Sequence, residues 1–80
     1  MERLRRILGL RPPVVSRERA LLVAKVYCEK NHWQWIEPVD ISARWGRWMI
    51  RTNSGKRGAN CRISVDQYTG AILGAGYVPR

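Results

Sequence analysis

The chain has 80 residues, a length typical of a single domain, and carries a formal net charge of +9. Its 45% hydrophobic residues, with four Trp and three Tyr, are enough for a small core and exclude a wholly disordered chain. The charge favours polyanionic partners, whether nucleic acid, an anionic membrane surface or an acidic protein, and does not select among them.

Residues 1–14 form a basic segment that contains the pair Pro12-Pro13 near its end. Leu4, Ile7 and Leu8 share one side of a short helix that would be marginal alone, so we predict a flexible basic arm. Its apolar run is shorter than the roughly seven to fifteen residues of a signal peptide, and no apolar stretch is long enough for a transmembrane span. We therefore expect a cytoplasmic protein.

Residues 15–80 read as a single α+β domain that begins with a helix from Arg17 to Asn31. Ser16 is a favourable N-cap, and Glu18 lies in the first turn, where a negative charge suits the helix dipole. The apolar positions follow helical spacing and predict an amphipathic helix that covers a sheet. These positions are Ala20, Val23, Ala24, Tyr27 and Cys28.

Three or four antiparallel strands follow in hairpin order, as a meander with the helix on one face. Trp45-Gly46 is predicted as a tight turn and residues 53–59 as a mobile loop. Residues 66–70 are predicted as a turn, and Gly74-Ala75-Gly76 is expected to loosen the chain after a short last strand. The predicted strands are residues 39–44, 47–52, 60–65 and 71–73.

Alternation within these strands sorts apolar residues onto one face and arginines onto the other. The apolar set is Val39, Ile41, Ala43, Trp48, Ile50, Cys61, Ile63 and Val65. The other face is predicted to be solvent-exposed and basic, which indicates a binding surface. We expect partner contact through Arg44, Trp45, Arg47, Met49, Arg51 and Arg62, with Lys56 and Arg57 of the loop.

We predict different environments for the four tryptophans. Trp48 shares the parity of Ile50 and belongs to the core, whereas Trp33 and Trp35 close the end between helix and sheet. Trp45 at the hairpin tip has two readings of equal weight. It is either an exposed contact residue or a cation–π cap folded over a neighbouring arginine.

Residues with catalytic or metal-binding potential are few. His32 is the single histidine and lies at the predicted helix end, where a cation suits the C-terminal carbonyls. Cys28 and Cys61 fall at apolar positions, and we expect two buried free thiols rather than a disulfide. Two Cys and one His at these spacings do not form a recognised zinc site. We expect no enzymatic activity, no cofactor and no metal.

Three segments resemble PepSY-like domains, which are small modules of one helix and a meander sheet. They are Ser-Arg-Glu-Arg-Ala-Leu-Leu-Val-Ala-Lys from Ser16, the strand from Trp48 to Asn53, and Ile-Ser-Val-Asp-Gln-Tyr-Thr-Gly-Ala-Ile from Ile63. The resemblance covers about residues 15–73 and includes the family's hydrophobic-Asp-x-x-Thr-Gly-x-hydrophobic turn. It implies non-catalytic protein binding, as in peptidase inhibitors or immunity proteins of bacterial toxin systems, and transfers no catalytic residue.

The sequence therefore predicts a non-catalytic bacterial binding module whose basic sheet face contacts an acidic protein partner. The alternative is nucleic-acid binding, because an arginine-lined sheet with an aromatic tip can hold a phosphate backbone and stack bases. The chain carries no recognised nucleic-acid motif. Exposed sheet edges also leave the oligomeric state open.

Overall fold

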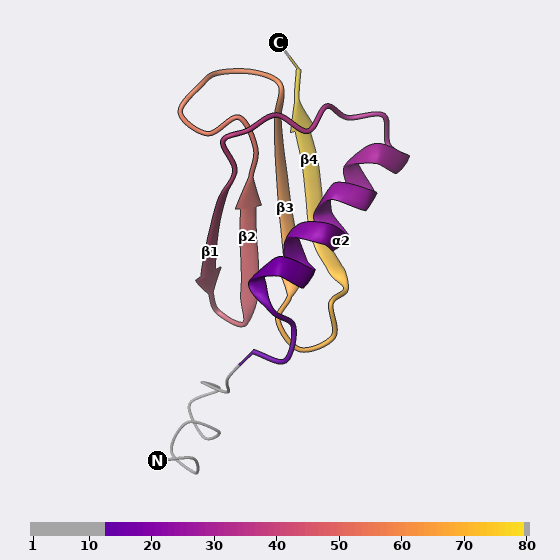
Figure 1. The fold of residues 1–80 in the computed structure, drawn as a ribbon, viewed down its shortest axis with the longest axis vertical. Coiled ribbons are helices and arrows are strands. Elements are labelled where there is room, and N and C mark those ends of the chain that lie inside the picture. The colour runs from indigo at the N-terminus through magenta and orange to yellow at the C-terminus, as the bar shows by residue number, and fades with distance from the viewer. Residues whose placement is uncertain (1–12, 80) are drawn as a thin grey trace.

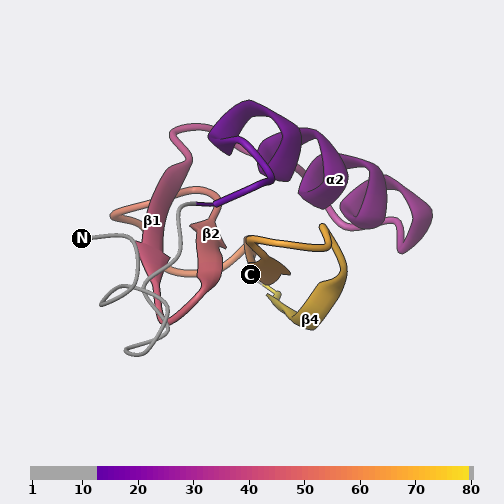
Figure 2. The same ribbon diagram turned by 90° about the horizontal axis from the view of Figure 1, so that it is seen from below.

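The computed structural model describes residues 13–79 and contains one helix and a four-stranded antiparallel sheet (Figure 1). In chain order the elements are α2 (Arg17–Lys30), β1 (Asp40–Arg44), β2 (Arg47–Arg51), β3 (Asn60–Asp66) and β4 (Ile72–Val78). Sequential strands are neighbours, so the sheet is a meander, and α2 packs on one of its faces (Figure 2). The predicted α+β fold is confirmed. Residues 1–12, most of the predicted arm with its short helix, lie outside the described residues.

Helix α2 begins and ends close to the predicted residues. The Ser16 hydroxyl accepts a hydrogen bond from the Arg19 amide at 3.1 Å, and Asn31 forms the C-cap. Three small side chains at a spacing of four, Ala20, Ala24 and Cys28, are fully buried. Small residues let the helix backbone approach the sheet closely, so this seam sets the distance between the two layers.

The predicted core is confirmed where the helix covers the sheet. Trp48, Ile50, Cys61, Ile63 and Val65 of β2 and β3 are at most 8% exposed. The indole N–H of Trp48 donates to the carbonyl of Val15 at 2.8 Å, which satisfies its one polar group.

Strand β1 departs from this pattern. Ile41 is half-buried and Ala43 is exposed, although both have the core parity. The helix packs mainly on β2 and β3, while β1 is the edge strand next to β2 (Figure 2). Alternation therefore predicted the correct face, and the limited width of a single helix explains the exposure.

Strand β4 corrects a second prediction, because it extends through Gly74 and Gly76 to Val78. Pairing with β3 holds this segment extended, with Gly74 opposite Ser64 and Gly76 opposite Arg62. The low strand propensity of glycine is outweighed by these ladder hydrogen bonds. The register shifts between Ser64 and Val65, beside the start of β4.

The loop of residues 53–59, predicted to be mobile, has an internal hydrogen-bond network. The side-chain amide of Asn60 donates to the main-chain carbonyls of Thr52, Asn53 and Lys56 at 2.9, 3.0 and 3.2 Å. The side-chain amide of Asn53 donates to the Gly58 carbonyl at 2.9 Å. Both asparagines are buried, and their side-chain amides donate to main-chain oxygens of the loop. The composition of the loop gave no sign of this network.

The turn after β3 explains its Asp-x-x-Thr-Gly sequence. Asp66 Oδ1 accepts hydrogen bonds from the amides of Tyr68 and Thr69 at 2.7 and 3.0 Å. The Thr69 hydroxyl accepts from the Ala71 amide, and Gly70 takes a φ of +79°, which favours glycine. The pattern therefore has a structural role in this chain.

Candidate interaction face

The sheet face opposite α2, called the open face below, presents side chains in three cross-strand rows. Within residues 13–79 no helix or strand covers it. The first row is Asp40, Arg51, Arg62 and Gly76; the second is Ser42, Met49, Ser64 and Gly74; the third is Arg44, Arg47 and Asp66. The predicted basic residues of the strands thus lie on one surface.

Arg51 and Arg62 lie at the centre of the first row. They are register partners on adjacent strands, and both are exposed. Within residues 13–79 no hydrogen bond or ion pair engages either guanidinium group. Asp40, the register partner of Arg51 on the other side, accepts a hydrogen bond from the Ser54 hydroxyl. The two guanidinium groups are therefore available to an external anion.

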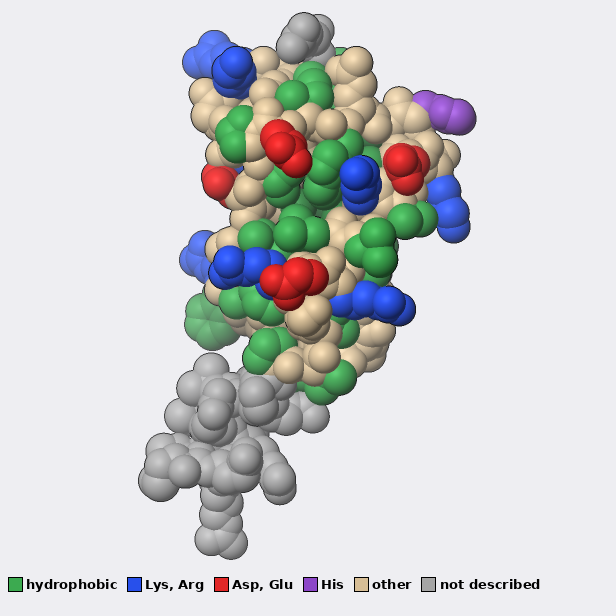
Figure 3. Space-filling model, in the orientation of Figure 1, with side chains coloured by type: hydrophobic (Ala, Val, Ile, Leu, Met, Phe, Trp, Pro, Cys, Tyr) green, Lys and Arg blue, Asp and Glu red, His purple; other side chains and the backbone are tan. Residues whose placement is uncertain are grey.

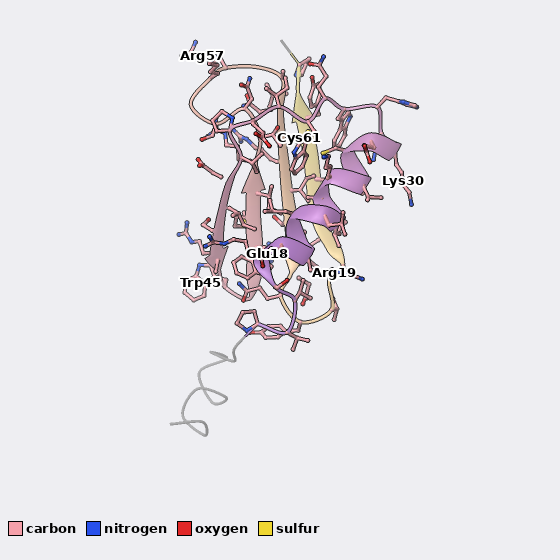
Figure 4. All side chains as sticks on the ribbon, in the orientation of Figure 1. Glu18, Arg19, Lys30, Trp45, Arg57 and Cys61 are labelled. Atoms are coloured by element: carbon pink, nitrogen blue, oxygen red, sulfur yellow. The ribbon has the colours of Figure 1, made fainter. Side chains whose placement is uncertain are left out.

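Arg44 and Arg47 lie at the end of the face where the β1–β2 hairpin turns. Trp45 at its tip is 86% exposed and points away from the sheet (Figure 4). Trp45 and Gly46 have φ values of +53° and +75°, typical of a two-residue hairpin turn. An indole folded over an arginine would lose more of its exposed surface, so Trp45 is exposed and does not cap an arginine.

Lys56 and Arg57 lie in the β2–β3 loop, at the end of the sheet opposite Trp45 (Figure 4). Arg57 borders a hollow of about 450 Å³ that Arg51 and Arg62 also line. Lys56 is exposed and is not among the residues of that hollow. Arg57 therefore lies next to Arg51 and Arg62 around one hollow, whereas Lys56 and Arg57 are both far from Trp45.

A second hollow of about 510 Å³ lies over the first and second rows. Three residues of the predicted binding surface, Met49, Arg51 and Arg62, line it. Asp40, Ser42, Ser64, Gly74 and Gly76 also line it and were not among the residues predicted for that surface. Strand alternation continued from Ile72, which packs against the core, would have placed both glycines on the core face. The register shift at Leu73 turns them to the open face instead.

The face that carries α2 differs in how its charges are arranged. Acidic and basic side chains intermingle there among hydrophobic ones (Figure 3). The helix carries Arg17, Arg19, Lys25 and Lys30 with Glu18 and Glu29, whereas the rows of the open face carry four arginines with Asp40 and Asp66. The open face is therefore distinguished by the adjacent guanidinium groups of Arg51 and Arg62 at its centre, and not by a larger net charge.

The two cysteines are free and fully buried between helix and sheet. Burial, hydrogen bonding to the Cys61 side chain and the nearby charges raise the pKa of the Cys28 thiol to about 12. The Cys61 thiol donates to the Gln34 carbonyl at 3.3 Å. Because its pKa is raised, the Cys28 thiol stays protonated near neutral pH and is a poor nucleophile.

His32 is exposed in the turn after α2, with a φ of +60°. Its amide donates to the Glu29 carbonyl at 3.2 Å, so its main chain closes the helix end. Trp33 stacks on Tyr77 with ring centroids 5.8 Å apart, which agrees with its predicted place at the end between helix and sheet.

In residues 13–79 no three His, Cys, Asp or Glu side chains gather in a group that could hold a metal ion. The same part of the chain has no helix with the length and apolar character needed to cross a membrane. Comparison with protein-family models, curated proteins and solved structures gives no match.

Proposed function

We propose that this protein is a PepSY-like, non-catalytic binding module that contacts an acidic protein partner through its open face. The observation that carries the proposal is the uncovered central pair of Arg51 and Arg62, available on the face opposite the core. Arginine suits carboxylates because its planar guanidinium group makes two parallel hydrogen bonds. Arg44, Arg47 and Arg57 extend the basic surface to both ends of the sheet.

The partner is a folded or extended protein segment that presents Asp and Glu residues. Long-range attraction to a basic face increases the rate of encounter, and the central arginines fix the orientation of the bound partner. An immunity-like or inhibitor-like role requires that the protein bind its partner and does not require a chemical reaction. Two buried free thiols agree with a reducing compartment, so we place the protein in a bacterial cytoplasm.

Two charge-matched triple variants test this proposal by capture from an extract of the native host treated with nuclease. The open-face variant carries Arg47→Glu, Arg51→Glu and Arg62→Glu, and the helix variant carries Arg17→Glu, Arg19→Glu and Lys25→Glu. All six positions are exposed. We expect the wild type and the helix variant to capture the same acidic protein, and the open-face variant to lose it. Equal capture by both variants would contradict the proposal.

The second candidate function is nucleic-acid binding, which the exposed indole of Trp45 between Arg44 and Arg47 favours. Bases stack on such rings while arginines contact the backbone. Fluorescence anisotropy of labelled single- and double-stranded DNA and RNA across a salt series distinguishes the two functions. Micromolar binding near physiological salt that Trp45→Ala weakens would support nucleic acid. Weak binding that disappears with added salt would show only nonspecific attraction.

A further inference from the structure

The hollow of about 510 Å³ on the open face has a floor made partly of two glycines in β4. Neither Gly74 nor Gly76 has a positive φ, and a Cβ on either would meet nothing within 4 Å. The backbone conformation and the available space would therefore accept larger side chains. Glycine within a strand weakens it and often marks a place where a ligand or another chain approaches closely.

The adjacent bulge does not account for both glycines. The register shift lies between Ser64 and Val65, so the irregular residue of β4 is Leu73. Gly76 pairs regularly with Arg62, one row away from the irregularity. A bare strand surface at this position has no explanation in the geometry of the sheet itself.

The walls of the hollow combine apolar and charged groups. Met49 is 39% exposed, and its sulfur accepts a hydrogen bond from the Ser64 hydroxyl at 3.5 Å. Thioethers pack favourably against aromatic rings. Within sheets, aromatic rings also pack over strand glycines and cover their exposed backbone. At the charged end of the hollow, Arg51 and Arg62 present two guanidinium groups beside the carboxylate of Asp40, which accepts a hydrogen bond from the Ser54 hydroxyl.

We propose that the hollow receives an aromatic side chain of the acidic partner while an adjacent carboxylate of that partner binds Arg51 and Arg62. This inference rests on the proposed function and adds the chemistry of the recognised segment, an aromatic residue next to Asp or Glu. The glycines supply the space, Met49 supplies a polarisable wall, and the arginines supply the charge.

The test is an NMR titration of the ¹⁵N-labelled protein with three peptides at about physiological salt. They are acetyl-Glu-Trp-Glu-amide, the equally charged acetyl-Glu-Ala-Glu-amide, and the uncharged acetyl-Gln-Trp-Gln-amide. We expect the first peptide to shift the amide signals of Gly74 and Gly76 and to bind about fivefold more tightly than the second. The uncharged peptide is expected to bind more weakly than both.

Gly74→Val fills the hollow without changing charge, in a backbone conformation that accepts a side chain. We expect this variant to keep the wild-type affinity for the Ala peptide and to lose the advantage of the Trp peptide. Gly76→Thr repeats the test at the regular pair, and Leu22→Val on the exposed side of α2 is the control that changes neither affinity.

Each failure has a different meaning. Equal binding of both acidic peptides to the wild type, with shifts at Arg51 and Arg62, would overturn the aromatic site and leave the acidic partner in place. An advantage of the Trp peptide that survives both glycine substitutions would also overturn the site. If neither acidic peptide shifts any signal of the open face, the proposed function itself fails.

Discussion

Arg51 and Arg62 are direct register partners across β2 and β3, with both side chains on the open face. Like charges placed opposite each other in an antiparallel sheet destabilise the pair. The fold therefore carries a cost at the centre of the surface that we propose binds an anion. Such a cost is expected at binding sites, where function and stability conflict.

Removing one of these charges is expected to stabilise the free protein. Arg62→Thr replaces arginine by a good strand former and should increase the free energy of unfolding by about 0.2–1 kcal/mol, measured by urea denaturation. Arg47→Thr is the control, because Arg47 lies between Arg44 and Asp66 and its loss removes an attraction together with a repulsion. A lower stability of Arg62→Thr than of the wild type would show that the pair causes no strain.

The raised pKa of Cys28 predicts a loss of stability at alkaline pH. The thiol has an ordinary pKa of 9.0 when unfolded and about 12 when folded, so above pH 9 the unfolded chain releases its proton first. Stability from this group is complete below pH 9 and decreases as the pH rises toward 12. Urea denaturation at pH 7, 9 and 10.5 should show a shallower decrease for Cys28→Ala than for the wild type. Identical slopes would contradict the raised pKa.

The same burial predicts slow thiol chemistry. At pH 8 the native protein should react with iodoacetamide far more slowly than the urea-unfolded chain, because Cys28 and Cys61 are both inaccessible. Mass spectrometry counts the modified thiols over time. Rapid modification of the native protein would show that the helix separates from the sheet.

Asn60 is expected to support the whole β2–β3 loop. Asn60→Ala removes the donor to three main-chain carbonyls and should cost about 1–3 kcal/mol of unfolding free energy, because buried acceptors lose their partner. Asn60→Asp should be more damaging, since a carboxylate would face those oxygens. Lys56→Ala, at an exposed position of the same loop, is the control. Equal stability of Asn60→Ala and the wild type would show that the Asn60 side chain does not stabilise the β2–β3 loop.

The small-residue seam of α2 is expected to tolerate no enlargement. Ala24→Leu inserts a large side chain at a fully buried position and should destabilise the protein by about 1–3 kcal/mol. Leu22→Ala, on the exposed side of the same helix, should change stability little. Thermal unfolding of both variants measures the difference. A fully stable Ala24→Leu would show that the helix can move away from the sheet.

Much of the fold could be predicted from local sequence signals. Ser16 and the spacing of Ala20, Ala24 and Cys28 define the helix, and alternation around Trp48 and Ile63 defines two strands. These signals are local because capping and side-chain periodicity act within a few residues. The prediction failed at Gly74 and Gly76, where pairing with β3 determines the conformation.

The candidate site was predictable in part for the same reason. Alternation placed Arg51 and Arg62 on one face, but it gave no relation between residues far apart in the chain. The register that sets Gly76 beside Arg62, and so forms the hollow, is a tertiary property. The hydrogen bonds of Asn60 are likewise invisible in the composition of its loop.

The central claim is contact between the open face and an acidic protein, and site-specific photo-crosslinking tests it most directly. p-Benzoylphenylalanine replaces Arg44 on the open face, outside the hollow, or Leu22 on the outer side of α2, both exposed. After irradiation in native-host cells, we predict that the Arg44 variant crosslinks to one acidic protein and the Leu22 variant does not. Crosslinks to that protein from Leu22 alone, or crosslinks from Arg44 only to nucleic acid, would contradict the claim.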